Sequence, residues 1–221
     1  MHIRPEIKEK IVLALDVDTV EQAKELITEL KDYVGVFKIG LQMYTGNGYE
    51  IFNFMREQNI KFFFDVKLHD IPNTVAKSAE NIIRHGASFF NLHTTGGEEM
   101  MRKAQEAARN TAKELGRENP TILGVTLLTS INEEGLQNEL KVSYKPDEYA
   151  MHLAILAKNA GLDGVVASVW EARKIKQVCG RDFKVLCPGI RPDWSDKNDQ
   201  KRLATPSVAI KEGADYLVIG R

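Results

Sequence analysis

Residues 61–75 read KFFFDVKLHDIPNTV, and they join a buried strand to a cluster of charges. The run 60–66 is mostly apolar and contains three consecutive phenylalanines, a pattern typical of a strand buried on both faces. Asp65, Lys67 and Asp70 follow within a few positions of one another. Because side chains two apart on a strand point the same way, we predict that Asp65 and Lys67 share one face.

Charges at the end of a buried strand are costly unless they are paired. The pattern fits either a surface ion pair on a solvated strand end or a functional site. The phenylalanine run favours the functional site, because the strand that leads into the charges is predicted to be buried. Pro72 suits the first turn of a helix, so we expect a helix to begin just after Asp70.

The rest of the chain alternates short apolar runs with helical patterns. Strands are expected at 11–16, 34–40, 60–66, 88–93, 121–128, 164–168, 183–187 and 216–219, and helices at 19–30, 44–58, 72–85, 97–114, 146–160 and 171–178. Alternating strands and helices indicate an α/β fold with a parallel sheet, and eight such units predict a closed (β/α)8 TIM barrel. A doubly wound open sheet is the alternative, but no Gly-x-Gly-x-x-Gly follows the first strand.

The sequence of 221 residues fits one barrel domain over 1–221. It stops directly after the last expected strand, so the eighth helix is missing from it. We expect the sequence to be incomplete at its C-terminus.

Composition narrows the class of protein. The net charge of −1 gives no reason to expect nucleic acid or a lipid surface as a partner. We find neither an apolar run near the ~20 residues of a membrane span nor the apolar core of a secretion signal. Cys179 and Cys187 lack a metal-binding spacing, and free thiols in a reducing, cytoplasmic compartment are the simplest interpretation.

Polar residues recur where the expected strands end. They are Asp16, Lys38, Asp65, Lys67, His93, Thr129, Arg191 and Arg221. In a barrel these positions meet at one mouth, where active sites are built. His93 also fits a hydrogen-bonded structural role, which we favour, and the direction of His69 is left open. No His, Asp and Glu cluster has a convincing metal spacing, so we expect no metal.

The last two expected strands are followed by a second signal, Pro-Gly-Ile-Arg at 188–191 and Gly220-Arg221. Barrels often bind phosphate with the loops after these two strands, since glycine admits backbone N–H groups and arginine offers a bidentate fork. The polar, Trp-containing stretch 191–205 is either a lid over the site or a solvated loop.

The motif Asp65-x-Lys67-x-x-Asp70 with Ile71-Pro72-Asn73-Thr74 resembles the signature of bacterial orotidine 5′-phosphate decarboxylases. Its first half is shared with other phosphosugar-handling barrels, and the Ile-Pro-Asn-Thr continuation makes the match specific. The resemblance extends along nearly the whole chain. It implies removal of CO2 from C6 of orotidine 5′-phosphate, giving uridine 5′-phosphate in pyrimidine biosynthesis without a cofactor.

By this resemblance, Lys67 is the proton donor to C6 and Asp65 lies by the substrate carboxylate. Asp16 and Lys38 would contact the ribose hydroxyls. Lys38 would also complete a catalytic row of alternating charges with Asp65, Lys67 and Asp70. The flanking carboxylates would favour the ammonium form of Lys67.

The resemblance also implies a homodimer in which Asp70, Ile71 and Thr74 reach the neighbouring subunit's site. Further implied contacts to the pyrimidine and the phosphate come from Thr129, Gln200, Arg191, Gly220 and Arg221. Two alternatives stay open: a metal-dependent phosphosugar decarboxylase or aldolase of the same barrel group, and a non-catalytic barrel that binds a nucleotide phosphate.

Overall fold

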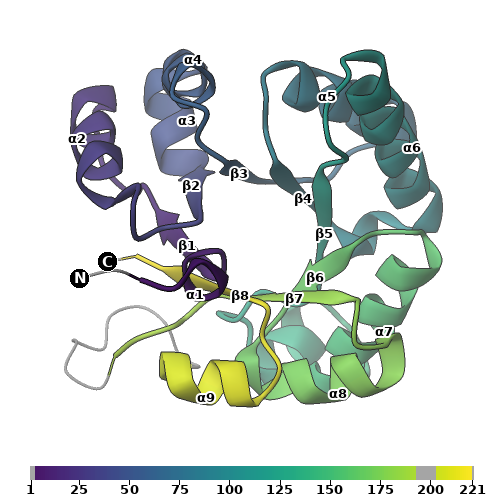
Figure 1. Cartoon of the computed structure of the whole chain (residues 1–221). Coiled ribbons are helices and arrows are strands. Elements are labelled where there is room, and N and C mark those ends of the chain that lie inside the picture. Colours follow the sequence, from purple (N-terminus) through teal and green to yellow (C-terminus); the bar gives the residue numbers. More distant parts are fainter. Residues whose placement is uncertain (1–2, 193–202, 221) are drawn as a thin grey trace.

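Eight parallel strands close into a barrel in which each strand pairs with its neighbours in sequence and β8 pairs with β1 (Figure 1). This computed structural model describes residues 3–192 and 203–220. The strands are β1 (Ile11–Ala14), β2 (Val36–Gly40), β3 (Phe62–Leu68), β4 (Phe89–His93), β5 (Thr121–Val125), β6 (Gly164–Val166), β7 (Lys184–Cys187) and β8 (Tyr216–Ile219). The predicted (β/α)8 TIM barrel is confirmed as the fold.

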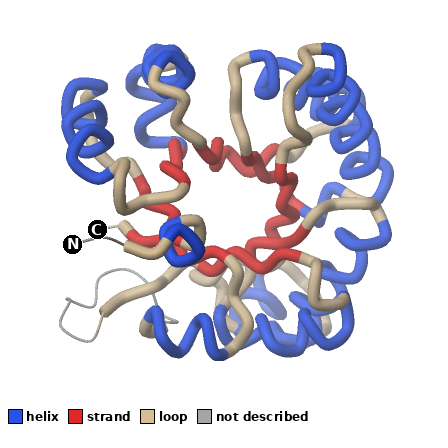
Figure 2. Tube along the Cα trace, in the orientation of Figure 1, coloured by secondary structure: helices blue, strands red, loops and turns tan. Residues whose placement is uncertain are grey.

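Helices surround the ring of strands (Figure 2). They are α1 (Pro5–Lys8), α2 (Val20–Leu30), α3 (Leu41–Asn47), α4 (Glu50–Glu57), α5 (Pro72–Arg84), α6 (Glu98–Glu114), α7 (Pro146–Asn159), α8 (Val169–Cys179) and α9 (Pro206–Lys211), with a 3-10 turn η1 (Thr94–Gly96) and a π-helical turn η2 (Gly135–Glu139). In the described ranges, no helix combines the length and apolar character that crossing a membrane requires.

The core has two layers because strand side chains alternate between faces. The residues that fill the inside of the barrel are Val12, Val36, Phe63, Phe89, Leu123 and Leu186. Those on the outer face pack against the apolar faces of the helices, as Phe37 and Phe64 do in the larger cluster. Because these side chains fill the interior, the barrel is a packed core rather than a pore.

Local capping sets several helix starts. Thr19 accepts a hydrogen bond from the Gln22 N–H, and the Gln22 side chain reaches back, so α2 begins where the sequence predicts. Ser168 forms the same kind of box with Glu171. The sixth strand therefore ends before Ser168, and α8 begins two residues earlier than predicted.

Three helix predictions were wrong or missing. The helix expected at 44–58 is two helices, α3 and α4, separated at Gly48, whose φ of 59° breaks the helix. The short helices α1 and α9 were not predicted. Each has a proline in its first turn, but neither is long enough to show a helical period.

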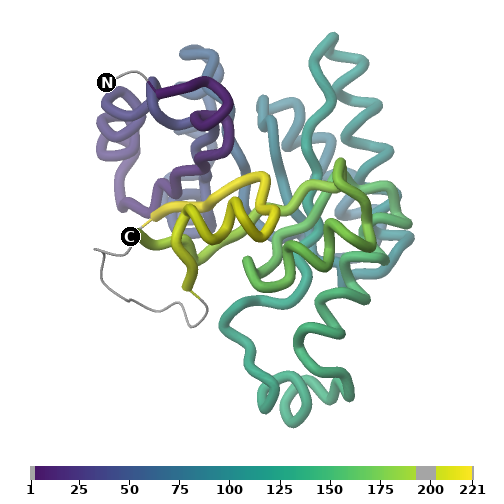
Figure 3. The backbone as a smooth tube through the Cα atoms, turned by 60° about the horizontal axis from the view of Figure 1, so that its bottom comes forward, coloured from purple at the N-terminus to yellow at the C-terminus, as the bar shows by residue number. Residues whose placement is uncertain are grey.

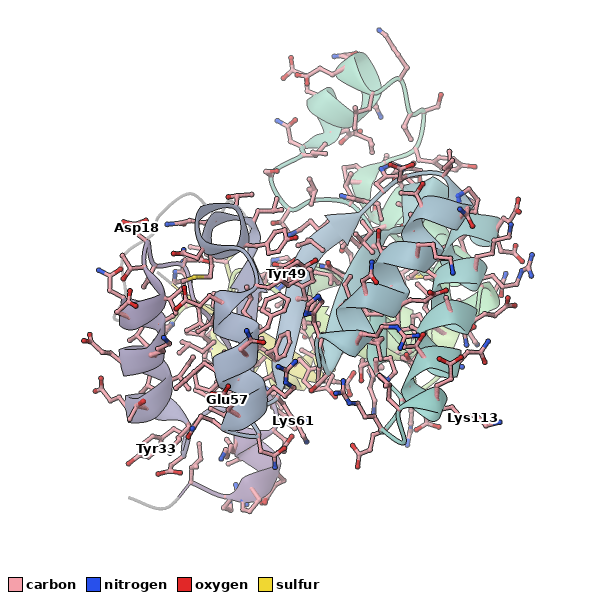
Figure 4. The ribbon with its side chains drawn as sticks, turned by 90° about the horizontal axis from the view of Figure 1, so that it is seen from above. Asp18, Tyr33, Tyr49, Glu57, Lys61 and Lys113 are labelled. Atoms are coloured by element: carbon pink, nitrogen blue, oxygen red, sulfur yellow. The ribbon has the colours of Figure 1, made fainter. Side chains whose placement is uncertain are left out.

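The two ends of the barrel differ in shape. The stretch 129–145, which contains η2, projects from the end where Asp18 lies, whereas Tyr33, Lys61 and Lys113 lie at the opposite end (Figure 4). Figure 3 shows α1 and this projecting stretch at opposite ends of the molecule. Since Asp18 follows β1 and Lys61 precedes β3, the stretch projects from the mouth formed by the strands' C-terminal ends.

Candidate active site

Strand alternation aims two charged side chains into the mouth. Lys38 lies two residues after the interior Val36 on β2, and Asp65 lies two residues after the interior Phe63 on β3. Both side chains are largely buried, with 11% and 14% of their surface exposed. Burial of single charges would be costly, so their position requires partners.

The partners form a continuous row of alternating charge. Lys38 Nζ lies 3.5 Å from Asp16 Oδ1 and 3.4 Å from Asp65 Oδ2. Lys67 Nζ lies 2.7 Å from the other carboxylate oxygen of Asp65, Oδ1. Asp65 therefore stands between two ammonium groups, and each oxygen of its carboxylate faces one of them.

This arrangement controls the ionisation of Asp65. Burial alone would raise its pKa, but the charges of Lys38 and Lys67 and hydrogen bonds from Lys67 and Asn91 outweigh burial and hold the pKa below its usual range. The carboxylate consequently stays ionised at neutral pH. It presents a fixed negative charge next to the Lys67 ammonium.

The backbone at Lys67 departs from a regular strand. Its φ is 51°, in the left-handed region that a non-glycine residue occupies at a cost of about 1–3 kcal/mol. The pairing of β3 with β4 also shifts: Phe64 faces Phe90, and the next pair is Leu68 with Leu92. The same-face prediction for Asp65 and Lys67 rested on regular alternation, which does not hold here, although the two side chains still meet.

A cavity of about 380 Å³ opens at this row. Its floor is apolar and its rim polar. The lining residues include Ala14, Asp16, Lys38, Phe63, Asp65, Lys67, Val125, Leu127, Thr129, Ser130, Val166, Leu186, Pro188, Gly189, Arg191, Val218 and Gly220. A concave site that combines apolar surface with convergent polar groups is the usual form of a small-molecule site.

The loop after β7 brings an arginine to the cavity. Gly189, with φ of 72°, turns the chain, and a bridge between Ile190 and Ala204 fixes the loop, with the Arg191 N–H donating to the Ala204 carbonyl. Arg191 Nη1 donates to the Ile190 carbonyl at 3.0 Å, while the buried Nε has no acceptor within the described ranges. A buried N–H that lacks an acceptor is suited to bind an anion.

Gly220 completes this side of the mouth. A Cβ at this position would lie 3.2 Å from Ala14 Cβ and 3.7 Å from Asp16 Oδ2. The glycine thus keeps the backbone after β8 close to the cavity and to Asp16.

The structure brings most of the predicted site residues together. Those that line the one cavity are Asp16, Lys38, Asp65, Lys67, Thr129, Arg191 and Gly220. Gln200 and Arg221 lie outside the described residues, as does most of the expected lid, 191–205.

Asp70, Ile71 and Thr74 do not line the cavity of their own chain. They lie at the start of α5, where all three are exposed, Ile71 by 67%. Asp70 accepts a hydrogen bond from the Ile71 N–H at 2.6 Å.

His69 and His93 lie beside the mouth with ring centroids 5.4 Å apart. Burial, followed by the neighbouring His69 and Lys67, lowers the pKa of His93 below its ordinary value of 6.5. In residues 3–192 and 203–220, no three His, Cys, Asp or Glu side chains gather in a way that could hold a metal ion.

Sequence reasoning missed Asn91. Its side chain is fully buried on β4, accepts from the Lys67 N–H at 2.8 Å and donates to Asp65 Oδ1 at 2.7 Å. One signal was available: Asn91 alternates with Phe89 and His93, so a barrel places it inside at the mouth.

The fold and the site together define a class: a (β/α)8 barrel enzyme whose mouth holds a row of alternating charges and an arginine in one cavity. The model of the orotidine 5′-phosphate decarboxylase / HUMPS family matches residues 9–221, and the chain belongs to that family.

Relatives and solved structures agree with this assignment. The orotidine 5′-phosphate decarboxylase of Moorella thermoacetica is 43% identical over 219 residues, covering 99% of this chain and 87% of the relative. That of Syntrophomonas wolfei is 45% identical over 215 residues, covering 97% and 90%. The crystal structure of the enzyme from Lactobacillus acidophilus superposes with a TM-score of 0.84 at 33% identity, covering 96% of this chain and 89% of that one.

Proposed function

We propose that this chain is an orotidine 5′-phosphate decarboxylase, a carboxy-lyase that converts orotidine 5′-phosphate to uridine 5′-phosphate and CO2 in pyrimidine biosynthesis. Family membership and the relatives' activity support this assignment. The observation that carries it is the Lys67 ammonium, held 2.7 Å from the Asp65 carboxylate in the same cavity as Arg191.

The reaction is difficult because the electrons left at C6 lie in the plane of the pyrimidine ring. They are not delocalised into its π system, and most decarboxylases use a cofactor as an electron sink. We propose that fixed charges take this role without a cofactor. The bond from C6 to the carboxylate carbon breaks, its electron pair stays on C6, CO2 leaves, and Lys67 gives C6 a proton.

The rest of the row keeps this ammonium in place. Asp65 accepts from Lys67, and Lys38 balances the second oxygen of Asp65, so the charges are buried as a group rather than singly. We assign Asp16 and Lys38 to the ribose hydroxyls and Thr129 to the edge of the pyrimidine. All three line the cavity.

Carbanion stabilisation ranks above ground-state repulsion in this proposal. Asp65 beside the substrate carboxylate would contribute about 4 kcal/mol of repulsion, at a separation of about 4 Å and an effective dielectric constant near 20. That is well below the 8 kcal/mol or so at which enzymatic rate enhancements begin. The Lys67 charge acts where negative charge develops, and it therefore favours the transition state over the bound substrate.

The phosphate is assigned to Arg191 and Gly220, together with Gln200 and Arg221 from outside the described residues. The buried Nε of Arg191 and the turn at Gly189 support this assignment. The phosphate lies away from the bond that breaks, so its binding energy can organise the site for the chemical step.

We further propose a homodimer in which Asp70, Ile71 and Thr74 contribute to the partner's site. An isoleucine that is 67% exposed beside an exposed aspartate at the start of α5 supports this proposal. In a two-fold dimer each subunit gives this segment to the other.

Subunit complementation tests the dimer. Lys67→Ala and Asp70→Ala variants should each be inactive alone. Mixed by unfolding and refolding together, they should regain roughly a quarter of wild-type activity, because half the dimers are hybrid and each hybrid has one intact site. Mixtures that stay inactive would place Asp70 and Lys67 in the same chain's site, whereas an Asp70→Ala variant that is active alone would remove Asp70 from catalysis.

We also propose a cytoplasmic location. Cys179 and Cys187 are both buried and free, as expected of thiols in a reducing compartment.

The activity itself is tested by the loss of orotidine 5′-phosphate ultraviolet absorbance with a metal chelator present. Metal-independent loss supports the decarboxylase. No loss of orotidine 5′-phosphate, with metal-dependent turnover of a phosphosugar instead, would favour a phosphosugar decarboxylase or aldolase of the same barrel group. Nucleotide binding without turnover of either substrate would favour a non-catalytic barrel.

A further inference from the structure

Asn91 occupies the point where β3 and β4 lose their regular pairing. Phe64 pairs with Phe90 and Leu68 with Leu92, so three residues of β3, Asp65 to Lys67, stand against one residue of β4. A shift of this kind leaves backbone groups of the longer strand without ladder partners. The side chain of Asn91 takes over one of them, the Lys67 N–H, at 2.8 Å.

The amide nitrogen of the same side chain forms a hydrogen bond with the row of alternating charges. Asn91 Nδ2 donates to Asp65 Oδ1 at 2.7 Å, the oxygen that also accepts from Lys67 Nζ at 2.7 Å. Asn91 is fully buried, so no solvent exposure compensates a lost bond. One side chain thus holds both the backbone of Lys67 and the carboxylate that receives its ammonium.

We propose that Asn91 is the positioning residue of this site: it selects the left-handed backbone of Lys67 and so aims the ammonium at the reacting carbon. A left-handed non-glycine residue persists only where its surroundings impose that conformation, and functional sites are where this occurs. The bond from the Lys67 N–H to Asn91 is such a constraint. The inference rests on the proposed function, because the reacting carbon is C6 of orotidine 5′-phosphate.

The amide suits the position because it offers one acceptor and one donor at once. Alanine would leave the Lys67 N–H and one bond to Asp65 unmade. A carboxylate would repel Asp65, but a protonated carboxyl would again supply an acceptor and a donor in the same shape. Asn91→Asp should therefore work in acid and fail as the pH rises.

The test measures turnover of orotidine 5′-phosphate by the wild type, Asn91→Asp and Asn91→Ala across a range of pH. Asn91→Ala should lose about 100-fold or more in kcat while uridine 5′-phosphate binds within a few-fold of wild type. Asn91→Asp should recover toward wild type as the pH falls, with a transition above the ordinary range of a carboxyl group because Asp65 is its neighbour. The wild type should lack this transition.

Thr94→Val is the matched control. Thr94 is also buried, directly after β4, but its hydroxyl donates to the Val125 carbonyl on β5. This variant should lower the melting temperature and leave the pH profile of kcat as in the wild type. If Asn91→Ala does not fold, the pH profile of Asn91→Asp alone tests the positioning role of Asn91.

A pH profile of Asn91→Asp parallel to the wild type, or a kcat loss in Asn91→Ala no larger than in Thr94→Val, would overturn the positioning role. Turnover by the wild type in the same series separates the proposed decarboxylase function from the positioning role of Asn91. A wild type that does not turn over orotidine 5′-phosphate would contradict the proposed function. An active wild type whose kcat and pH profile are unaffected by substitution of Asn91 would contradict only this inference.

Discussion

Asp163 and Asp215, at the end of the barrel where the strands begin, each accept a hydrogen bond from the backbone of the neighbouring strand. Ile122 N–H donates to Asp163 at 2.8 Å, and Val185 N–H donates to Asp215 at 2.7 Å. Each carboxylate is also paired with a cation from a surrounding helix, Arg109 or Lys176. At the mouth, Asp65 accepts instead from the side chains of Lys67 and Asn91 and faces a cavity.

The difference separates stability from function. Carboxylates that bond strand backbone tie β5 to β6 and β7 to β8, and their loss leaves a backbone N–H unsatisfied. Charges that bond one another around an open cavity constrain the fold less but present an aligned field to a ligand. Substitutions at the two ends should therefore affect different measurements.

The largest effect is expected from Lys67→Ala. Turnover should fall by about 10⁴-fold or more, since both the proton donor and the charge beside C6 are lost. Binding of uridine 5′-phosphate, measured by calorimetry, should persist. The control is Lys176→Ala, which removes a cation paired with Asp215 at the other end and should leave turnover unchanged.

Arg191→Ala should weaken use of the phosphorylated substrate by about 10- to 100-fold in kcat/KM, as expected for the loss of a charged hydrogen-bonding partner. Turnover of orotidine, which lacks the phosphate, should change little. The measurement is kcat/KM for both substrates. An equal loss of kcat/KM for orotidine 5′-phosphate and orotidine would contradict the phosphate assignment. Arg173→Ala, which removes an exposed arginine paired with Glu212, serves as the control.

Asp215→Ala should show the converse behaviour. Loss of its bonds to Val185 N–H and Lys176 should lower the free energy of unfolding by about 1–3 kcal/mol, with kcat retained. Denaturant unfolding and turnover on the same preparation provide both values. A loss of kcat at unchanged stability would remove the distinction between the two ends.

The smallest effect concerns pH and His93. Burial, then the neighbouring His69 and Lys67, lower its pKa below 6.5. Between the lowered value and 6.5 the unfolded chain binds more protons than the folded one, so stability falls as the pH drops through this window and no further below it. Thermal unfolding of His93→Gln should show a smaller decline than the wild type, because His85, whose pKa burial and Arg56 also lower, still contributes. His152→Gln, on the exposed side of α7, should keep the full decline.

The sequence predicted the strands well because apolar runs and turns are local signals. β8 has the predicted bounds of 216–219, and Thr19 begins α2 as its capping pattern indicated. The positions of Lys38 and Asp65 in the mouth followed from the rule that barrel sites collect at strand ends.

What the sequence did not reveal depends on contacts between distant residues. The left-handed backbone of Lys67 and the role of Asn91 arise from the pairing shift between β3 and β4, which no single segment encodes. The break at Gly48 is the exception, because Gly46-Asn47-Gly48 is a local turn signal that the prediction of one helix passed over. The placement of Asp70 in a partner's site stays a prediction, since it depends on a second subunit.

The central claim is that the Lys67 ammonium stabilises a carbanion at C6 and exchanges a proton with it. By microscopic reversibility, the enzyme should also catalyse exchange of the C6 proton of uridine 5′-phosphate with deuterated water, which proton NMR measures without any decarboxylation. We predict exchange above the uncatalysed rate with the wild type and its loss in Lys67→Ala, although the product still binds. Exchange that persists in Lys67→Ala would contradict the account.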